Sequence, residues 1–434
     1  MKILWVCFFM LPAIAEQLGK PVANKEGWIA GLAEELAGKK GENGLETEEL
    51  ELSVCFAIPN NTKNGKFSEP NIQGIVKGIH YYSFHEDMVN LERYDAELEA
   101  EAKNILDQVK PDVLHIFGTE YGHGLAFARA FGKPEHTLVG LQGLMGACTE
   151  AYMAGLPEYV RRRVTFRDWL RRDSLWQQQQ KFGMRATMEK KLLQTTGHVT
   201  GRTNFDKQTA LAINPKVSYH FMNETLRSVF YQGIWKLATC KRHTLFVSQG
   251  NYPLKGLHQV LEVMPTLVKK YPDIKLYVAG DRITNRKTCK DRLKLSGYGK
   301  YLLELIRKGN LENRVIFLGK LDALEMKERM LKSHIFISPS SLENSSNSMG
   351  EAMLLGVPVV ASQVGGLPSL MTDEQEGLFY EFGDRKALVH CISRIFDTDS
   401  LALHISEQAR ERAAATHAPE ANKKRLLEIY GELC

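Results

Sequence analysis

Short apolar runs, with amphipathic stretches between many of them, recur along the whole chain. In the first half they lie at residues 2–9, 52–58, 78–84, 112–118, 136–142 and 198–202, and in the second half at 244–250, 274–280, 314–319, 334–340 and 358–363. The stretches 94–110 and 321–332, among others, carry apolar residues at helical spacing. Strands that alternate with helices predict parallel sheets joined by right-handed crossovers, and therefore doubly wound α/β domains.

The runs fall into two sets, and 434 residues exceed what one ordinary core accommodates. We therefore expect two Rossmann-like domains, residues 1–225 and 226–414. We also expect a C-terminal helix, about 415–434, that packs back on the first domain.

The N-terminus allows two interpretations. Lys2, the apolar run and the Ala-x-Ala ending at Ala15 resemble a secretory signal, which would make this a secreted protein. We favour a first buried strand over residues 2–9, because a parallel sheet covered on both faces needs such unbroken hydrophobicity. An irregular loop is expected at 12–27, where it would line a ligand site at the carboxyl end of that strand.

Composition narrows the class of protein. A formal charge of +5 is far from that of a dedicated nucleic-acid binder, but it suits anionic ligands or a loose membrane association. The seven cysteines are scattered singly and form no C-x-x-C pair, which favours a reducing, cytoplasmic compartment. No apolar stretch of about 18 residues occurs beyond the N-terminus.

A stretch rich in arginine lies at residues 159–173. Six arginines between Arg161 and Arg172 interleave with Phe166, Trp169 and Leu170. One interpretation is a solvated helical face. The other is contact with an anionic acceptor or with anionic lipid headgroups, as in a peripheral protein on the inner face of the cell membrane.

The segment 338–362 carries Glu343 and Glu351 with seven residues between them. A strand ends near Pro339, and a helix that begins around residues 344–348 stops at Gly356. A helix N-terminus at the carboxyl end of a parallel strand binds phosphate, whereas carboxylates accept hydrogen bonds from sugar hydroxyls. A nucleotide-sugar has both groups. The simpler alternative is a capping carboxylate and a solvated helix residue.

This block resembles the E-x7-E signature of glycosyltransferase family 4, whose members are retaining enzymes of GT-B fold. The matching residues are Pro339, Ser340, Glu343, Glu351, Ala352, Met353, Gly356, Pro358–Ala361 and Gly365–Gly366. The resemblance implies two Rossmann-like domains facing each other across a cleft, with Glu343 on the donor sugar and Glu351 on the ribose. Further donor contacts are expected from Asn344, Ser346, Asn347 and Ser348.

The segment 245–261 resembles the family's phosphate-binding strand, loop and helix. Lys255 matches the lysine that binds the diphosphate, although a simple exposed loop lysine is the alternative interpretation. The family's arginine position holds Gln249, followed by Gly250. A glutamine supplies no charge, so another cation would have to compensate. The candidates for that role are Arg282, Arg286 and Arg202.

The N-terminal half matches less closely. Gly27 stands where the family often has a glycine pair near the diphosphate, and Gln142 stands where many members place a histidine near the reacting sugar. We group Gln142 with Glu343 and Lys255 as catalytic candidates. Candidates for an acceptor or cleft site are His115, Glu120, His123 and Arg202, although a lone histidine is more often structural.

The resemblance implies transfer from a nucleoside-diphosphate-sugar, with UDP as the favoured nucleotide, to a glycan or lipid-linked acceptor in polysaccharide biosynthesis. It implies same-face substitution without a metal or other cofactor. Asp397 and Asp399 form a D-x-D pair that we interpret as a solvated helix end. The alternatives are a sugar-nucleotide 2-epimerase on the same scaffold and a non-catalytic sugar-nucleotide-binding protein. A third alternative, if residues 1–15 are cleaved, is a secreted carbohydrate-active protein.

Overall fold

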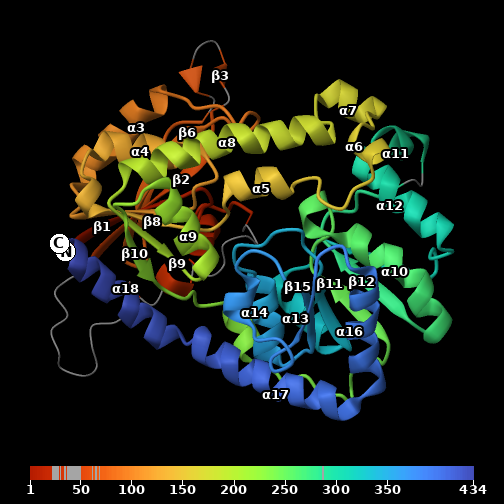
Figure 1. Cartoon of the computed structure of the whole chain (residues 1–434). Coiled ribbons are helices and arrows are strands. Elements are labelled where there is room, and N and C mark those ends of the chain that lie inside the picture. The colour runs from red at the N-terminus through yellow and green to blue at the C-terminus, as the bar shows by residue number, and fades with distance from the viewer. Residues whose placement is uncertain are drawn as a thin grey trace. The chain divides into compact units, whose positions relative to one another are not determined.

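The computed structural model describes residues 1–21, 29, 31–33, 36, 50–60, 62–63, 66–67, 69–285 and 288–434. The chain forms two compact α/β units (Figure 1). The first comprises residues 1–146, 182–226 and 417–434, and the second comprises 147–181 and 227–416. The expected first domain, 1–225, included residues 147–181, whereas the structure groups them with the second unit.

The first unit contains an eight-stranded sheet in the order β10-β9-β8-β7-β1-β2-β6-β5. Its strands are β1 (Lys2–Cys7), β2 (Glu51–Pro59), β5 (Gln73–Val76), β6 (Ile79–Glu86), β7 (Val113–Phe117), β8 (Thr137–Gly140), β9 (His198–Gly201) and β10 (Ser218–Phe221). All pairs are parallel except β5 with β6. A separate hairpin pairs β3 (Thr62–Lys63) with β4 (Lys66–Phe67).

The second unit contains a six-stranded, fully parallel sheet in the order β13-β12-β11-β14-β15-β16. Its strands are β11 (Thr244–Val247), β12 (Lys275–Ala279), β13 (Val315–Gly319), β14 (Ile335–Ser338), β15 (Val359–Ser362) and β16 (Leu378–Tyr380). The strand order reverses between β11 and β14, and in the first unit between β1 and β7. Ligands of such sheets bind at this reversal, beyond the carboxyl ends of the strands.

Helices connect the strands and cover the sheets. In the first unit they are α1 (Pro12–Gln17), α3 (Glu97–Val109), α4 (Gly122–Phe131), η1 (Pro134–His136), α5 (Met145–Ala151, which continues into the second unit), α9 (Asn204–Ile213) and α18 (Pro419–Leu433). In the second they are α6 (Glu158–Arg161), α7 (Phe166–Arg171), η2 (Ser228–Tyr231), η3 (Pro253–Lys255), α10 (Leu257–Lys270), α11 (Cys289–Leu293), α12 (Gly297–Lys308), α13 (Ala323–Leu331), α14 (Asn347–Leu355), α15 (Leu367–Leu370), α16 (Arg385–Asp397) and α17 (Asp399–Thr416). Helix α8 (Leu175–Thr195) begins in the second unit and ends in the first.

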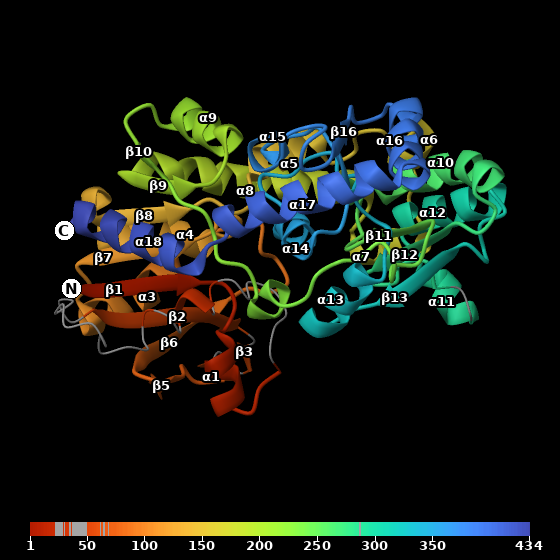
Figure 2. The ribbon, with the colours of Figure 1, turned by 90° about the horizontal axis from the view of Figure 1, so that it is seen from below.

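The helix at the C-terminus, α18, packs against the centre of the first sheet (Figure 2). Ile3, Trp5 and Cys7 on β1 share a buried cluster with Leu426 and Tyr430 of this helix. The Trp5 Nε1–H donates to the Tyr430 hydroxyl at 2.7 Å. The run at residues 2–9 is therefore a central buried strand, as expected.

One local expectation is corrected by the structure. The segment expected to be irregular from residue 12 begins with helix α1, and Pro12 occupies its first turn, where a missing N–H costs nothing. The arginine-rich stretch contains two short helices, α6 and α7. Within the part of the chain that the structure describes, no helix is both long and apolar enough to span a bilayer.

Candidate functional site

The E-x7-E segment lies at the point where the second sheet reverses its strand order. Strand β14 ends at Ser338, a loop carries Glu343, and α14 begins at Asn347. Ser346 is the N-cap, and its hydroxyl accepts a hydrogen bond from the Met349 N–H at 3.3 Å. This arrangement is the predicted one, with one glutamate before the helix and Glu351 inside it.

Lys255 reaches the same place from η3, the short helix that follows the neighbouring strand β11. Its ammonium donates to Glu343 Oε1 at 2.6 Å, and the Ser340 hydroxyl donates to the same oxygen at 2.7 Å. The side chains of Lys255 and Glu343 are only 22% and 12% exposed. Residues 88 positions apart thus meet because parallel strands at the reversal point bring their carboxyl ends together.

The protonation of Lys255 is fixed by its neighbours. Burial by itself would lower the pKa of the lysine, but the Glu343 carboxylate and the Tyr252 hydroxyl raise it above the ordinary value. Lys255 therefore keeps its positive charge at neutral pH. In the absence of a ligand, Glu343 neutralises a cation that an incoming diphosphate would also attract.

Two glycines allow the loops of this site to approach each other. Gly256 has a φ of +64°, and a Cβ there would lie 1.7 Å from the Pro339 carbonyl oxygen. Gly365 has a φ of +53°, and a Cβ there would lie 2.1 Å from the Glu343 carbonyl oxygen. Any side chain at either position would displace the loop that carries Glu343.

Hydroxyl groups surround the N-terminus of α14. Ser248, just after β11, donates to the Ser348 hydroxyl at 3.1 Å, and the Ser346 hydroxyl lies 3.2 Å from that of Ser348. The Ser345 hydroxyl is buried and has no hydrogen-bond partner within the described structure. Asn344 is buried and Asn347 is half-buried. Free N–H groups and hydroxyls at a helix N-terminus are suited to a phosphate.

Glu351 lies inside α14 and is bound by an arginine that the sequence did not reveal. It is 3% exposed, and Arg227 forms a bidentate pair with it, Nε to Oε1 at 2.7 Å and Nη2 to Oε2 at 2.8 Å. Burial raises the pKa of Glu351, and Arg227 opposes this shift. Each carboxylate oxygen has a second acceptor site, so the expected ribose contact would have to be shared with Arg227.

The position that lacks the family's arginine is held by Gln249, and no contact of a candidate cation with it is seen among the described residues. Gln249 and Gly250 follow β11, where Leu257 packs so closely on Gly250 that a Cβ would lie 2.6 Å from it. The Arg282 guanidinium is exposed and lies 5.8 Å from the centre of the Phe317 ring. Arg286 and Gly27 are outside the described residues.

In the first unit, Gln142 belongs to a chain of polar contacts beyond β8 and β9. Its Nε2 donates to Glu224 Oε1 at 2.5 Å, and Arg202 Nη1 lies 3.0 Å from the other oxygen of Glu224. Arg202 is 4% exposed. Because Arg202 is paired within the first unit, the structure gives no support to its use as the missing phosphate cation.

A second polar cluster follows β7. Glu120 Oε1 accepts from the Gly143 N–H at 2.8 Å, and the Thr119 hydroxyl donates to Glu189 Oε2 at 2.7 Å. Glu189 also accepts from the N–H groups of Met145 and Gly146. Burial raises the pKa of Glu120, and it raises the pKa of Glu189 to about 7. Glu189 carries no sequence signal, since it lies in the middle of a helical pattern.

The two histidine candidates are buried rather than placed on a surface. His115 lies within β7, fully buried, and its Nδ1 lies 2.7 Å from the Tyr430 hydroxyl. Burial lowers its pKa to about 3, so it is neutral. His123 is 2% exposed, and its Nδ1 lies 2.9 Å from Glu86. Both side chains contact other elements of the first unit, and His115 also lines a small pocket with Gln142, Arg202 and Glu224.

The D-x-D pair lies where two helices meet, and each of its carboxylates is paired with a basic side chain. Asp397, at the end of α16, accepts from Lys270 at 2.6 Å, and Asp399, at the start of α17, pairs with Arg242 at 2.5 Å. Neither belongs to a cluster of three or more metal-ligating side chains in the described part of the chain.

Comparisons with known proteins find similar sequences for the second unit and similar folds for the whole chain. Residues 233–412 match the family described as glycosyl transferases group 1. A D-inositol 3-phosphate glycosyltransferase from Corynebacterium urealyticum is 27% identical over 186 residues, which cover 42% of this chain and 41% of that protein. Such alignments span less than half the length of the curated relatives.

Solved structures resemble the whole chain in fold. Sucrose-phosphate synthase from Thermosynechococcus elongatus matches with a TM-score of 0.70 and 16% identity, over 100% of this chain and 99% of that one. Anabaena HepE in complex with UDP and glucose matches with a TM-score of 0.65 and 15% identity, over 99% of each chain. The chain therefore has the predicted GT-B fold, and its residues 233–412 match the family described as glycosyl transferases group 1.

Proposed function

We propose that this protein is a retaining glycosyltransferase that moves a sugar from a nucleoside-diphosphate-sugar to an acceptor hydroxyl. The observation that carries the proposal is the contact between Lys255 and Glu343 at the reversal point of the second sheet, beside the N-terminus of α14. A cation and free amides match the diphosphate, and a carboxylate matches the sugar hydroxyls.

In this proposal Lys255 and the N-terminus of α14 stabilise the negative charge that develops on the leaving diphosphate. Glu343 releases Lys255 to the donor and accepts hydrogen bonds from the sugar. Glu351 stays paired with Arg227 and accepts a hydrogen bond from a ribose hydroxyl through a remaining lone pair. A double displacement would need a carboxylate free to attack the sugar, so we favour same-face substitution in which the leaving phosphate takes the acceptor's proton.

A metal is not required in this scheme. Asp397 and Asp399 are already paired with Lys270 and Arg242, so we do not assign them to a metal ion on the diphosphate. We propose UDP as the nucleotide, supported by the resemblance in fold to HepE, which was solved with UDP and glucose. A glycan or lipid-linked acceptor, within polysaccharide biosynthesis, is the corresponding proposal for the second substrate.

A thermal-shift panel of nucleoside diphosphates and their sugars tests this function. The matching ligand at about 100 times its dissociation constant adds about 2.7 kcal/mol to the free energy of unfolding. Slow release of free nucleotide from the donor indicates a transferase, whereas formation of an epimer without acceptor indicates the 2-epimerase. Binding without turnover under any acceptor would indicate a non-catalytic protein, and no shift with any nucleotide would contradict the proposed site.

A further inference from the structure

The second unit exposes a group of large apolar side chains next to exposed arginines. Exposed fractions are 68% for Trp169, 65% for Leu170, 59% for Val164 and 56% for Phe166. In α7, residues 166, 169 and 170 lie on one helical face, and the rings of Phe166 and Trp169 are 6.1 Å apart. We call these four side chains, with Arg171 and Arg172, the aromatic–arginine patch.

Contacts on the opposite side of α7 keep the aromatic–arginine patch on the surface. Thr165 and Asp168 form a capping box at the start of α7, and Asp168, 1% exposed, also accepts from the Gly297 N–H of α12 at 2.9 Å. Arg167 pairs with Asp168 and Asp173 on this inner side. The polar side of α7 is therefore anchored to the unit, and exposure of its apolar side is a fixed feature of the fold.

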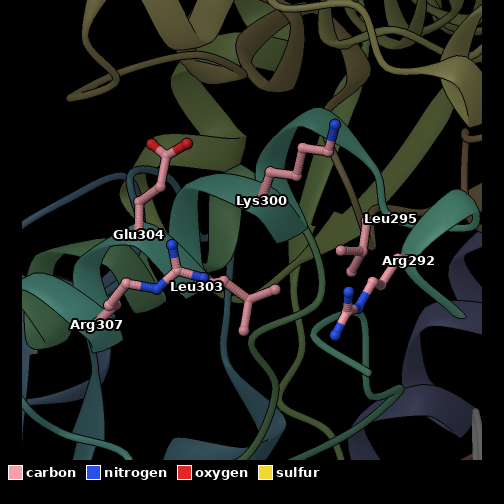
Figure 3. Close-up of a pocket in the computed structure, with 6 residues that line it drawn as sticks. All are labelled: Arg292, Leu295, Lys300, Leu303, Glu304 and Arg307. Atoms are coloured by element: carbon pink, nitrogen blue, oxygen red, sulfur yellow. The ribbon is translucent and has the colours of Figure 1, made fainter. Parts of the chain in front are cut away.

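Figure 3 shows a basic pocket of about 530 Å³ in the second unit. It is lined by Arg292, Leu295, Lys300, Leu303, Glu304 and Arg307. The carboxylate among these side chains, Glu304, is neutralised by Arg163 of the patch segment at 2.8 Å. Figure 3 shows the leucine side chains among the charged ones. The pocket thus offers cations and apolar surface together.

We propose that the second unit docks on anionic phospholipid membranes through the aromatic–arginine patch, with the basic pocket binding a lipid phosphate. Trp, Phe and Leu beside arginines are the side chains of interfacial membrane contacts, and each basic residue near an anionic surface adds to the attraction. A soluble polyanion would satisfy the arginines, but it would leave Val164 and Leu170 facing water. A bilayer accommodates both kinds of side chain. This inference does not rest on the proposed transferase activity.

The test is co-sedimentation of the full chain with phosphatidylcholine vesicles, with and without phosphatidylglycerol, at low salt. The wild type is expected to bind the vesicles that contain phosphatidylglycerol. Trp169→Ala/Leu170→Ala and Arg171→Glu/Arg172→Glu are each expected to weaken this binding by about tenfold or more. Arg292→Ala/Arg307→Ala is expected to weaken it by a smaller factor and to reduce the preference for phosphatidylglycerol.

Matched variants elsewhere on the second unit are the controls. Leu324→Ala/Leu403→Ala removes apolar side chains of similar exposure, and Lys236→Glu/Lys241→Glu reverses two exposed charges. Both, together with the donor-site variant Lys255→Ala, should bind vesicles as the wild type does. Circular dichroism checks that each variant is folded.

Insertion is read independently from tryptophan fluorescence. Brominated phosphatidylglycerol should quench the wild type, and most of this quenching should be lost in Trp169→Phe. Failure of the wild type to bind, equal binding by patch and control variants, or quenching that survives in Trp169→Phe would each overturn the proposal. So would tight binding to a soluble polyanion that abolishes vesicle binding but is unaffected by Trp169→Ala/Leu170→Ala.

Discussion

At the scale of single residues, the pairing of Glu351 with Arg227 explains how an acidic side chain is tolerated in the core of the second unit. Arg227→Ala leaves a buried carboxylate without its partner, and the free energy of unfolding should fall by about 3–5 kcal/mol. Urea denaturation measures this loss. Arg227→Ala/Glu351→Ala should recover part of it, because no charge is then left unpaired. Equal losses in the single and double variants would contradict the coupling.

Glu189 makes the stability of the first unit depend on pH. Burial raises its pKa from 4.5 to about 7, so between these values the folded chain binds a proton that the unfolded chain has lost. The contribution of this bound proton to the free energy of unfolding is complete below about pH 4.5 and is lost as the pH rises through about 7. The change is on the order of 3 kcal/mol.

The control for this prediction is Glu189→Gln, which cannot titrate. The difference in unfolding free energy between the wild type and this variant should change across pH 5–7 in the direction given. The buried histidines, whose pKa values are lowered by burial, contribute equally to both proteins and cancel. A difference that does not vary with pH would rule out the titration of Glu189.

Sequence reasoning identified residues whose role is local and missed those whose partner is distant. Glu343 and Lys255 were identified because the short segments around them resemble two motifs of a glycosyltransferase family. Arg227 and Glu189 carry no local signal, since their partners are 124 and 70 positions away. The burial of His115 and His123 could not be predicted for the same reason, because their partners Tyr430 and Glu86 come from other elements.

At the scale of elements, Gly256 controls the approach of the loop after β11 to the loop after β14. Gly256→Ala would place a Cβ 1.7 Å from the Pro339 carbonyl, so the loop that carries Lys255 must move. Gly319→Ala is the matched control, because Gly319 also has a positive φ of +82° but has open space around it.

The control should lose about 1–2 kcal/mol from backbone strain alone. Gly256→Ala should lose about 1–3 kcal/mol more and should also lose donor binding. Thermal unfolding and nucleotide titration measure the two effects. Equal losses in both variants would show that the close approach of Gly256 to the Pro339 carbonyl does not affect stability.

Buried parallel strands were the elements that the sequence predicted best, since an unbroken apolar run such as residues 112–118 is typical of a strand covered on both faces. The edge strands β5, β10 and β16 were missed, because they are short or only half-buried and lack that signature. Helix α1 was missed because Pro12 and Gly19 made its segment resemble a loop, although Pro12 suits a first helical turn.

At the scale of the whole molecule, the C-terminal helix α18 completes the core of the first unit. The Tyr430 hydroxyl accepts from Trp5 Nε1–H at 2.7 Å, and it forms a second hydrogen bond with Nδ1 of the neutral His115 at 2.7 Å. Tyr430→Phe leaves two buried polar groups without partners, at a cost of about 1–3 kcal/mol each. Hydrogen exchange should become faster in β1 and β7. Strands β11 to β15 provide the internal control, and equal acceleration there would contradict a local effect.

The central claim is that Lys255 binds a donor diphosphate and Glu343 binds the donor sugar. Isothermal titration of the nucleoside diphosphate selected by the thermal-shift panel, and of its sugar conjugate, tests this claim most directly. Lys255→Ala should weaken the binding of both ligands by about 10- to 100-fold, because a charge-assisted contact is lost. Glu343→Ala should weaken only the sugar conjugate, since its removal frees Lys255 for the diphosphate. Unchanged binding of both ligands by Lys255→Ala would contradict the account.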